Sequence, residues 1–517
     1  MAAKTPTALY KEAQALEESG DVRGAIKLYK SFLSKFRTHP NALKMRVRTA
    51  QLCVMSAQHE EAVKLIENCG GLGERNLLMM YTLAQANAYL GKLEDAQSAL
   101  EKVLDIDPDY PPGIARLSTI LQYEGRSDEA LEVLNKAMDR GVDAWDLDHT
   151  LGELAKKAGR VDEAVDRIER RLTTDSKLKN TPRIELEFML ASLKESQKDY
   201  RGAWEAATRG NSLKTTSGLG GYTLQKGKKL VINMDKHRQR LETVKSIYNP
   251  EFLRSLEPTE SGPDSRHQSL MISGMPRSGT TLLEQILSAH PDAESAAEAS
   301  CLYRIAVELK LYPDPVDRLI TRSSVNKRTK FGKRLLDELR VITKGSEYTV
   351  DKNPGNDEMI GLLAAIAPGS KMILTRRDPR DVALSCYFRN FASGHEWTTN
   401  FGTIAEMCEM RQELHEYWLD VIPEHAPWIG LTVGDYQKIV ENPESETRRI
   451  VEFAGLSWDD ACLNFSKRKR IIPTLQPHQA AQGVYKGSLA KWAPYAEFMG
   501  DALDHLNRIC ERFDYPV

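Results

Sequence analysis

A repeat of 34 residues in the first part of the chain constrains the fold more than any other feature. Alanines recur at intervals of 34 residues, at Ala62, Ala96, Ala130 and Ala164, and the last three stand in the pattern Gly-x-x-Asp/Glu-x-Ala. Ala25 and Ala203 extend the series at looser spacings of 37 and 39 residues. Each unit predicts a helix, a glycine-centred turn and a second helix, with the alanine where the two helices approach. Because such a pair cannot bury its apolar face alone, the units must stack into a solenoid.

The repeat motif resembles a known family. Gly91-Lys-Leu-Glu-Asp-Ala96 and Gly125-Arg-Ser-Asp-Glu-Ala130 are similar to the tetratricopeptide repeat, and the likeness covers about residues 5–214. It implies an N-terminal all-α solenoid over residues 1–214. Two roles stay open for it: a concave groove that binds a protein partner, or a support that only solubilises or dimerises the chain.

Residues 215–268 break the period and predict a linker. Ser217-Gly-Leu-Gly-Gly221 is a flexible turn, a basic helical stretch follows over residues 226–247, and residues 257–264 are rich in proline, glycine and acidic side chains. The remaining chain, residues 269–517, alternates short apolar runs with helical patterns. That alternation is typical of βαβ units around a parallel sheet.

A glycine loop follows the first predicted strand of this region. Ser269-Leu-Met-Ile-Ser273 leads into Gly274-Met-Pro-Arg-Ser-Gly-Thr-Thr281 and then into an apolar helical stripe. Glycines allow backbone N–H groups to close around phosphate oxygens, and a helix N-terminus adds its dipole. The loop therefore predicts an anion site. Thr280 replaces the lysine of the usual nucleoside-triphosphate loop, and Arg277 supplies the cation, so ATP bound in the usual way is not expected.

A second strand-to-helix junction lies about a hundred residues further on. Residues 371–375 predict a strand, and Asp378, followed by a proline, predicts the N-cap of the next helix. On that helix Ser385 and Arg389 are four residues apart and share a face, with Arg377 at its entrance. Two arginines and a hydroxyl group on one face suit a second, dianionic phosphate.

Together these two motifs resemble the sulfotransferases. The glycine loop, read on to His290-Pro291, looks like their 5′-phosphosulfate loop, and the segment from Leu374 to Asn390 looks like their 3′-phosphate segment. With the repeats, the chain resembles the bacterial tetratricopeptide-repeat sulfotransferases, whose catalytic domain is similar to that of tyrosylprotein sulfotransferases. The resemblance implies an α/β P-loop-like domain with a parallel sheet over residues 269–517. It also implies 3′-phosphoadenosine-5′-phosphosulfate (PAPS) as the sulfuryl donor, without a metal.

The resemblance also assigns residues to the site. Lys352 matches the lysine that faces the bridging oxygen, Glu298 matches the catalytic glutamate, and Arg277 acts with them on the transferred group. The donor-binding set that it implies is Arg277, Ser278, Gly279, Thr280, Thr281, Arg377, Ser385, Arg389, Tyr436 and Lys491.

Two departures and two alternatives accompany this assignment. Ala297 stands where the family has a glycine, and the Thr-x-Ser expected near Thr474 has glutamine as its third residue. His395, just past the second phosphate segment, and Glu294, close to Glu298 in sequence, remain alternatives for the general base.

Composition narrows the remaining possibilities. Seventy-one Lys and Arg against 73 Asp and Glu give a net charge of -2, so no global basic field attracts nucleic acid or an anionic membrane. Seven scattered cysteines without a C-x-x-C pair favour a reducing compartment, and we expect a cytoplasmic location. The longest near-apolar run, residues 359–367, is too short to span a bilayer, so no transmembrane segment is predicted.

The predicted activity is PAPS-dependent transfer of a sulfuryl group to a hydroxyl acceptor, which the repeats recruit directly or through a partner. Protein, sugar, lipid and small-molecule hydroxyls all remain possible acceptors, because fold does not determine substrate. Two alternatives stay open: a P-loop nucleotide kinase, and a repeat scaffold with an inactive sulfotransferase domain. The basic run Lys467-Arg-Lys-Arg470 is expected to be a solvated loop.

Overall fold

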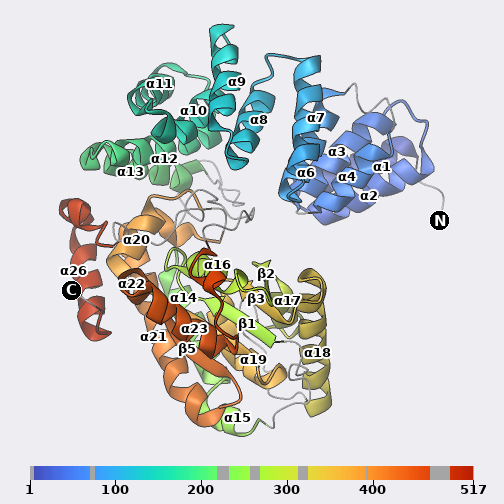
Figure 1. Cartoon of the computed structure of the whole chain (residues 1–517). Coiled ribbons are helices and arrows are strands. Elements are labelled where there is room, and N and C mark those ends of the chain that lie inside the picture. Colours follow the sequence, from blue (N-terminus) through green and yellow to red (C-terminus); the bar gives the residue numbers. More distant parts are fainter. Residues whose placement is uncertain are drawn as a thin grey trace. The chain divides into compact units, whose positions relative to one another are not determined.

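The computed structural model describes residues 5–56, 58–69, 76–217, 232–256, 268–311, 324–391, 394–465 and 489–515 (Figure 1). They form two compact units, residues 1–178 and 179–517. The sequence features at Lys467–Arg470 and Thr474 lie outside the described residues. Within the described ranges, none of the helices combines the length and the apolarity needed to cross a bilayer.

The first unit consists of helices that pack in consecutive pairs, as the repeat predicts. The pairs are α1 with α2, α3 with α4, α6 with α7, α8 with α9 and α10 with α11. Their bounds are α1 Pro6–Glu18, α2 Val22–Lys35, α3 Ala42–Met55, α4 His59–Glu67, α6 Leu77–Tyr89, α7 Leu93–Ile106, α8 Pro111–Tyr123, α9 Ser127–Asp139, α10 Trp145–Ala158 and α11 Val161–Thr174.

Small residues hold each helix pair together. The repeat alanines Ala62, Ala96, Ala130 and Ala164 are all completely buried. The turn glycines Gly91, Gly125 and Gly159 adopt φ values of 73°, 83° and 66°, a left-handed conformation that glycine adopts without a steric penalty. The predicted helix-turn-helix solenoid is confirmed.

One more helix pair, α12 (Asn180–Ser196) and α13 (Tyr200–Ser217), opens the second unit. Its repeat alanine, Ala203, is completely buried, like those of the first unit. However, α13 contacts two short 3-10 helices of the following domain, η2 (Glu396–Thr399) and η6 (Ala493–Tyr495). The border between the compact units therefore precedes residue 214, the predicted end of the solenoid.

The described strands of the second unit form a five-stranded sheet in the order β2-β3-β1-β4-β5, and every pairing is parallel. The strands are β1 Gln268–Ser273, β2 Ala293–Ala297, β3 Tyr348–Lys352, β4 Lys371–Arg376 and β5 Gly430–Asp435. Strand β1 lies in the middle, with β3 on one side and β4 on the other. The predicted parallel sheet is confirmed, and its strands β1 and β4 begin and end within one residue of the predicted runs.

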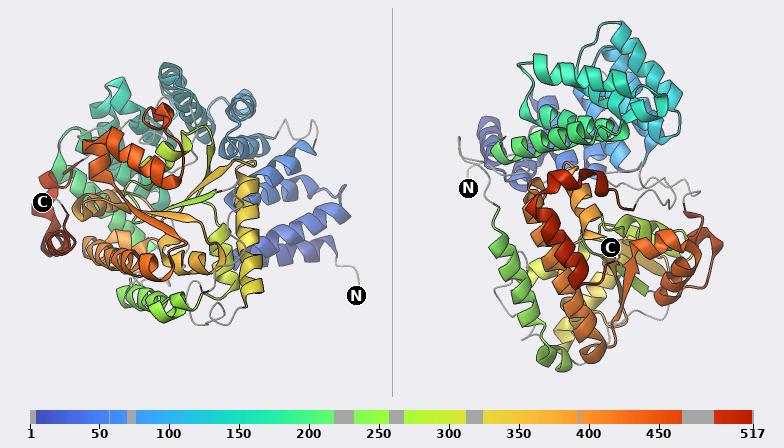
Figure 2. Two further views of the ribbon diagram at one scale, coloured as in Figure 1. Left: turned by 60° about the horizontal axis from the view of Figure 1, so that its bottom comes forward. Right: turned by 90° about the vertical axis from the view of Figure 1, so that its left-hand side faces the viewer.

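Helices cover both faces of the sheet (Figures 1 and 2). One apolar layer joins Leu283 and Ile286 of α16 and Ile450 of α23 to Leu270 and Ile272 of β1. The described helices of this unit after α13 are α14 Met234–Ile247, α15 Pro250–Arg254, α16 Thr280–Ser288, α17 Cys301–Glu308, α18 Val325–Ile342, α19 Ile360–Ile366, α20 Pro379–Tyr387, α21 Phe401–His425, α22 Tyr436–Glu441, α23 Pro443–Ala454, α25 Ala496–Met499 and α26 Asp501–Arg512. Besides η2 and η6, the 3-10 helices η1 Asn356–Met359 and η3 Asp460–Cys462 are described.

Candidate active site

The glycine loop connects the carboxyl end of β1 to the start of α16. Gly274 and Gly279 adopt φ values of 148° and 105°. A Cβ atom on Gly274 would lie 2.1 Å from Thr375 Oγ1, and one on Gly279 would lie 2.7 Å from Cδ2 of Tyr436. Both positions therefore require glycine, for conformation and for space. The same contact places Tyr436, the first residue of α22, directly against the loop.

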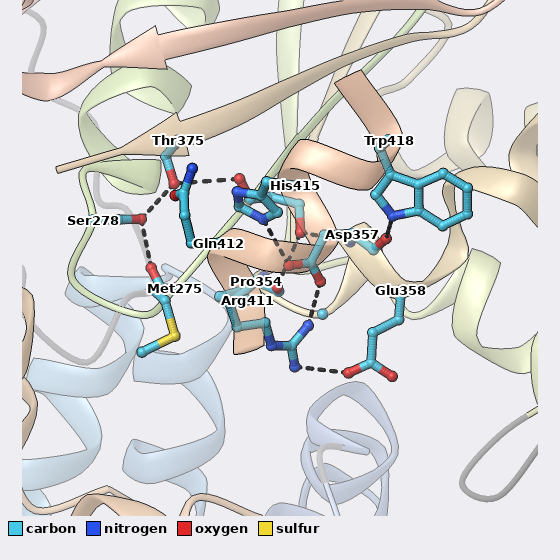
Figure 3. A network of polar contacts seen from close by, with 12 residues as sticks. Met275, Ser278, Pro354, Asp357, Glu358, Thr375, Arg411, Gln412, His415 and Trp418 are labelled. Carbon is cyan, nitrogen blue, oxygen red and sulfur yellow. Dashed lines mark hydrogen bonds and ion pairs between the residues drawn. The ribbon is translucent and has the colours of Figure 1, made fainter. Parts of the chain in front are cut away.

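Hydrogen bonds fix the interior of this loop (Figure 3). Buried Ser278 donates its hydroxyl to the carbonyl of Met275 at 2.6 Å and shares a second hydrogen bond with the hydroxyl of Thr375 at the end of β4. Helix α16 begins at Thr280, followed by Thr281, and its N-cap residue, Gly279, has no side chain that could cap the first turn. Free amide groups at a helix N-terminus attract an anion.

Three predicted arginines come together beside the loop, because β1 and β4 are parallel neighbours and their carboxyl ends meet at one edge. Arg277 donates from Nε to Ser385 Oγ at 2.9 Å, and Arg377 donates from Nη1 to the carbonyl of Arg277 at 3.0 Å. Burial lowers the pKa of Arg277 to about 10, and the positive charges of Arg389 and Arg377 contribute to this shift. Burial also lowers the pKa of Arg389. The cluster therefore has an excess of positive charge in a partly desolvated place.

Contacts on the outer side of this cluster hold Arg377. Its guanidinium lies over the Tyr436 ring, 4.4 Å from the centroid, and 3.7 Å from Asp381 of α20. Asp381 also accepts the backbone N–H of Trp492 at 3.1 Å. The exposed Lys491 precedes Trp492, so this contact brings the predicted lysine to the entrance of α20, while Lys491 itself stays at the surface.

Lys352 and Glu298 form an ion pair at the other side of β1. Lys352 ends β3, is 3% exposed, and has its Nζ 2.5 Å from Glu298 Oε1. The Glu298 side chain is 61% exposed, so the pair joins a buried ammonium group to a carboxylate that is open to solvent. Ala297, where the family has glycine, adopts a φ of 53°, which only glycine adopts without strain. Alanine therefore keeps the backbone bend that the family's glycine would allow.

Two acidic residues near Lys352 were not predicted from the sequence. Glu284 of α16 is 1% exposed, has its Oε2 4.0 Å from Lys352 Nζ, and accepts the Ser295 hydroxyl at 2.5 Å. Asp351 is buried next to Lys352 in the chain, and burial raises its pKa to about 7. A carboxylate within the apolar stripe of α16, four residues after Thr280, is the signal that could have indicated Glu284.

A buried ionic network supports the segment after β3 (Figure 3). The Asp357 carboxylate accepts from Arg411 at 2.5 Å and from His415 Nε2 at 3.0 Å, and its backbone N–H donates to Ser273 Oγ at 2.7 Å. Burial alone would raise the pKa of Asp357, but the charges of Arg411 and His415 hold it below its usual value. The network ties the segment after Lys352 to the end of β1. No motif in the sequence indicates it.

The alternative bases occupy different surroundings. The His395 ring lies between the rings of Phe391 and Trp397, with centroids 5.2 and 5.9 Å away, and burial lowers its pKa. Its Nδ1 is buried and has no hydrogen-bond partner among the described residues. Glu294 lies within β2, opposite Thr349 of β3.

Comparison with known proteins agrees with this architecture. Residues 269–460 match the model of the sulfotransferase family, and residues 7–39 and 88–147 match models of the tetratricopeptide repeat. The chain thus carries tetratricopeptide repeats followed by a sulfotransferase domain, as the motifs indicated.

Individual relatives are distant. An uncharacterised protein of Aquifex aeolicus is 27% identical over 85% of this chain and 60% of its own length. Protein-tyrosine sulfotransferase 1 of Danio rerio is 26% identical over 38% of this chain and 55% of its own length. The solved sulfotransferase domain of a Synechococcus olefin synthase is 17% identical, covers 50% of this chain and all of that domain, and has a TM-score of 0.32. The chain thus spans little more than half the length of the two curated relatives.

Proposed function

We propose that this chain, whose residues 269–460 form a sulfotransferase-family domain, transfers a sulfuryl group from PAPS to a hydroxyl acceptor. The observation that carries the proposal is the gathering of Arg277, Arg377 and Arg389 beside the glycine loop. The three guanidinium groups repel one another, and a bound polyanion would relieve that repulsion. PAPS offers two anionic ends, a 5′-phosphosulfate and a 3′-phosphate, and the site has two matching regions.

Each region suits one end of the donor. In this proposal the loop amides and the start of α16, with Ser278, Thr280 and Thr281, would bind the 5′-phosphosulfate. In the same scheme Arg377, Ser385 and Arg389 hold the 3′-phosphate with charge-assisted hydrogen bonds, the strong class of such bonds. Tyr436 packs on both the loop and Arg377, and therefore links the two regions.

Glu298 and Lys352 would perform the transfer. Glu298 accepts the proton of the acceptor hydroxyl as its oxygen bonds to sulfur. The bond from sulfur to the bridging phosphate oxygen breaks, and its electron pair leaves with adenosine 3′,5′-bisphosphate. Lys352, with Arg277, stabilises the negative charge that grows on that oxygen. We favour Glu298 over His395 because its carboxylate is exposed and directly paired with Lys352, whereas the His395 ring is enclosed by aromatic side chains.

The acceptor and the partner are proposed at the level of class. The relatives named protein-tyrosine sulfotransferases make a tyrosine hydroxyl the first acceptor to assay, followed by sugar, lipid and small-molecule hydroxyls. The repeats would recruit the acceptor or a partner protein through their concave surface. The seven cysteines, all within the described ranges, form no disulfide, which suits a reducing compartment such as the cytoplasm.

Calorimetry with nucleotides tests this function. Adenosine 3′,5′-bisphosphate should bind the full chain without added metal, and Arg377→Ala should weaken it by about 10- to 150-fold, the equivalent of one lost charged hydrogen bond. Adenosine 5′-phosphate, which lacks the 3′-phosphate, should be affected far less. Arg448→Ala, which removes an arginine of α23 that lies over Trp458, is the matched charge control.

The same experiment separates the alternatives. Equal losses for both nucleotides would contradict the assignment of Arg377 to the 3′-phosphate. Tight binding of ATP with phosphoryl transfer would support a nucleotide kinase. Donor binding without sulfation of any acceptor class would support a repeat scaffold with an inactive domain.

A further inference from the structure

Helix α13 contacts the chain segment that carries Arg389. This Arg389 segment, residues 387–391, starts at the last residue of α20 and is held by α13 at its first residue. Thr208 and Tyr387 share a hydrogen bond between their hydroxyl groups at 2.9 Å. Asn211, which is 1% exposed, donates from Nδ2 to the backbone carbonyl of Tyr387 at 2.9 Å. That carbonyl is one of those that the end of an α-helix leaves without an intrahelical partner.

The other end of the Arg389 segment is held in the same way. Lys214 of α13 donates from Nζ to the carbonyl of Phe391 at 2.9 Å. Asn390 donates from Nδ2 to Glu185 Oε1 of α12 at 2.9 Å. Polar contacts from α12 and α13 therefore fix the residues on both sides of Arg389.

An aromatic contact completes the attachment. The Trp204 ring of α13 lies 4.9 Å from the Tyr387 ring and 6.2 Å from the Phe388 ring, measured between centroids. It also packs on the rings of Phe401 and Phe498. Aromatic pairs at such distances contribute beyond their buried area, so this contact adds to the polar ones in holding Tyr387 and Phe388 against α13.

We propose that α12 and α13, a helix pair with the repeat pattern, are a positioning element of the donor site that fixes Arg389 against the 3′-phosphate. The proposal rests on the proposed function, because it takes Arg389 as a ligand of that phosphate. Asn211 is a positioning residue, because it acts through the backbone carbonyl of Tyr387, two residues before Arg389. A charged hydrogen bond depends steeply on distance and angle, so a small shift of the Arg389 segment should weaken phosphate binding.

A double-mutant cycle in the full chain tests this role. Asn211→Ala should weaken adenosine 3′,5′-bisphosphate by about tenfold, comparable to one lost hydrogen bond, and adenosine 5′-phosphate by less than about twofold. In an Arg389→Ala background the same substitution should have no further effect, because the group that it positions is gone. Ser212→Ala, at the exposed neighbouring position of α13, is the matched control and should change neither affinity.

Three results would overturn the proposal. One is an equal loss for both nucleotides; another is an undiminished effect of Asn211→Ala in the Arg389→Ala background. Either would show a general structural role for α13 and leave the proposed function intact. If Arg389→Ala itself left the affinity for adenosine 3′,5′-bisphosphate unchanged, the assigned phosphate site would fail, and the positioning role with it. Thr208→Val removes a single hydroxyl group from the contact with Tyr387 and supplies the same cycle if Asn211→Ala does not fold.

Discussion

Helix pairs α10–α11 and α12–α13 share a repeat pattern but belong to different compact units. Ala164 and Ala203, the repeat alanines of the two pairs, are both completely buried. The pattern thus specifies how two helices pack within a pair. The pattern does not specify which segment packs on the outer face of the pair. The side chains on that face determine whether the pair extends the solenoid or packs on the sulfotransferase domain.

Side chains outside the repeat pattern account for the difference. When the two pairs are aligned on their buried alanines, Trp204, Thr208 and Asn211 of α13 correspond to Val165, Glu169 and Leu172 of α11. The α13 set holds the Arg389 segment through an aromatic ring, a hydroxyl and an amide. The α11 set offers no equivalent group. A few substitutions on one helix face therefore distinguish a helix pair of the solenoid from one that packs on the sulfotransferase domain.

Truncating the chain on either side of α12 and α13 is the strongest test of the difference between the two helix pairs, and it has the largest expected effect. A fragment of residues 179–517 should bind adenosine 3′,5′-bisphosphate as the full chain does, because it keeps the complete second unit. A fragment of residues 215–517 should lose all binding, because it lacks Trp204 and exposes the aromatic rings of Tyr387 and Phe388. Calorimetry and circular dichroism of both fragments measure the outcome.

The two fragments also test the role of the first unit. If the repeats recruit the acceptor, residues 179–517 should keep donor affinity but sulfate the native acceptor poorly. Normal donor binding by residues 215–517 would contradict the assignment of α12 and α13 to the catalytic unit.

Substitution of the proposed base separates the effect on turnover from the effect on donor binding. Glu298→Gln should lower turnover by about 10²- to 10⁴-fold, the usual contribution of a positioned base, with donor affinity nearly unchanged. The factor by which turnover falls should be the same in the full chain and in residues 179–517, because the first unit contributes none of the proposed reacting groups. Steady-state rates with labelled PAPS provide the measurement. A larger loss from His395→Ala than from Glu298→Gln would transfer the role of base to His395.

The smallest expected effect concerns Lys214, the buried lysine of α13. Burial lowers its pKa to about 8, while Glu185 and Glu396 partly offset the shift. In the unfolded chain its pKa is near 10.5, so between these values the unfolded state binds more protons and folding becomes more favourable as pH rises. Relative to Lys214→Met, the wild-type free energy of unfolding should therefore rise by about 1–2 kcal/mol between pH 7 and pH 9.5.

Denaturant unfolding of both proteins at several pH values measures this difference. Lys136→Met, on the exposed face of α9, is the control, since its side chain is 66% exposed and paired with Glu132. A flat difference for Lys214→Met across this range would show that the lysine, which contacts the Phe391 carbonyl, is not desolvated in the folded chain.

The sequence predicted those parts of the molecule that follow from local pattern and chain order. Alanine spacing gave the helix pairs, and the N-cap Asp378 accepts the Arg380 amide at 2.8 Å as expected. Local spacing was sufficient for these features. The contact of Arg277 with Ser385 was not predicted, because the motifs assigned the two residues to different phosphate groups; it arises because both loops follow neighbouring parallel strands.

Other features depend on contacts that have no local signature. Glu284 lies on an otherwise apolar helix face, and its proximity to Lys352 exists only because α16 packs across β3. Asp357 and His415 are separated by 58 positions along the chain, yet they share a hydrogen bond. In the sequence, the face of α13 that carries Asn211 likewise resembles the ordinary polar face of a repeat helix. All three sets of contacts depend on long-range packing, which the spacing of residues along the chain does not encode.

The position of the border at Leu178 and Lys179 has a consequence for how such chains can diversify. Repeats inserted or removed upstream of Lys179 would leave every contact around Tyr387 intact, so the length of the array is free to change. A recombination junction placed after α13 would instead separate the Arg389 segment, part of the proposed nucleotide site, from the helices that hold it. A chimera that borrows this catalytic half should therefore carry α12 and α13 with it, whatever array is joined ahead of them.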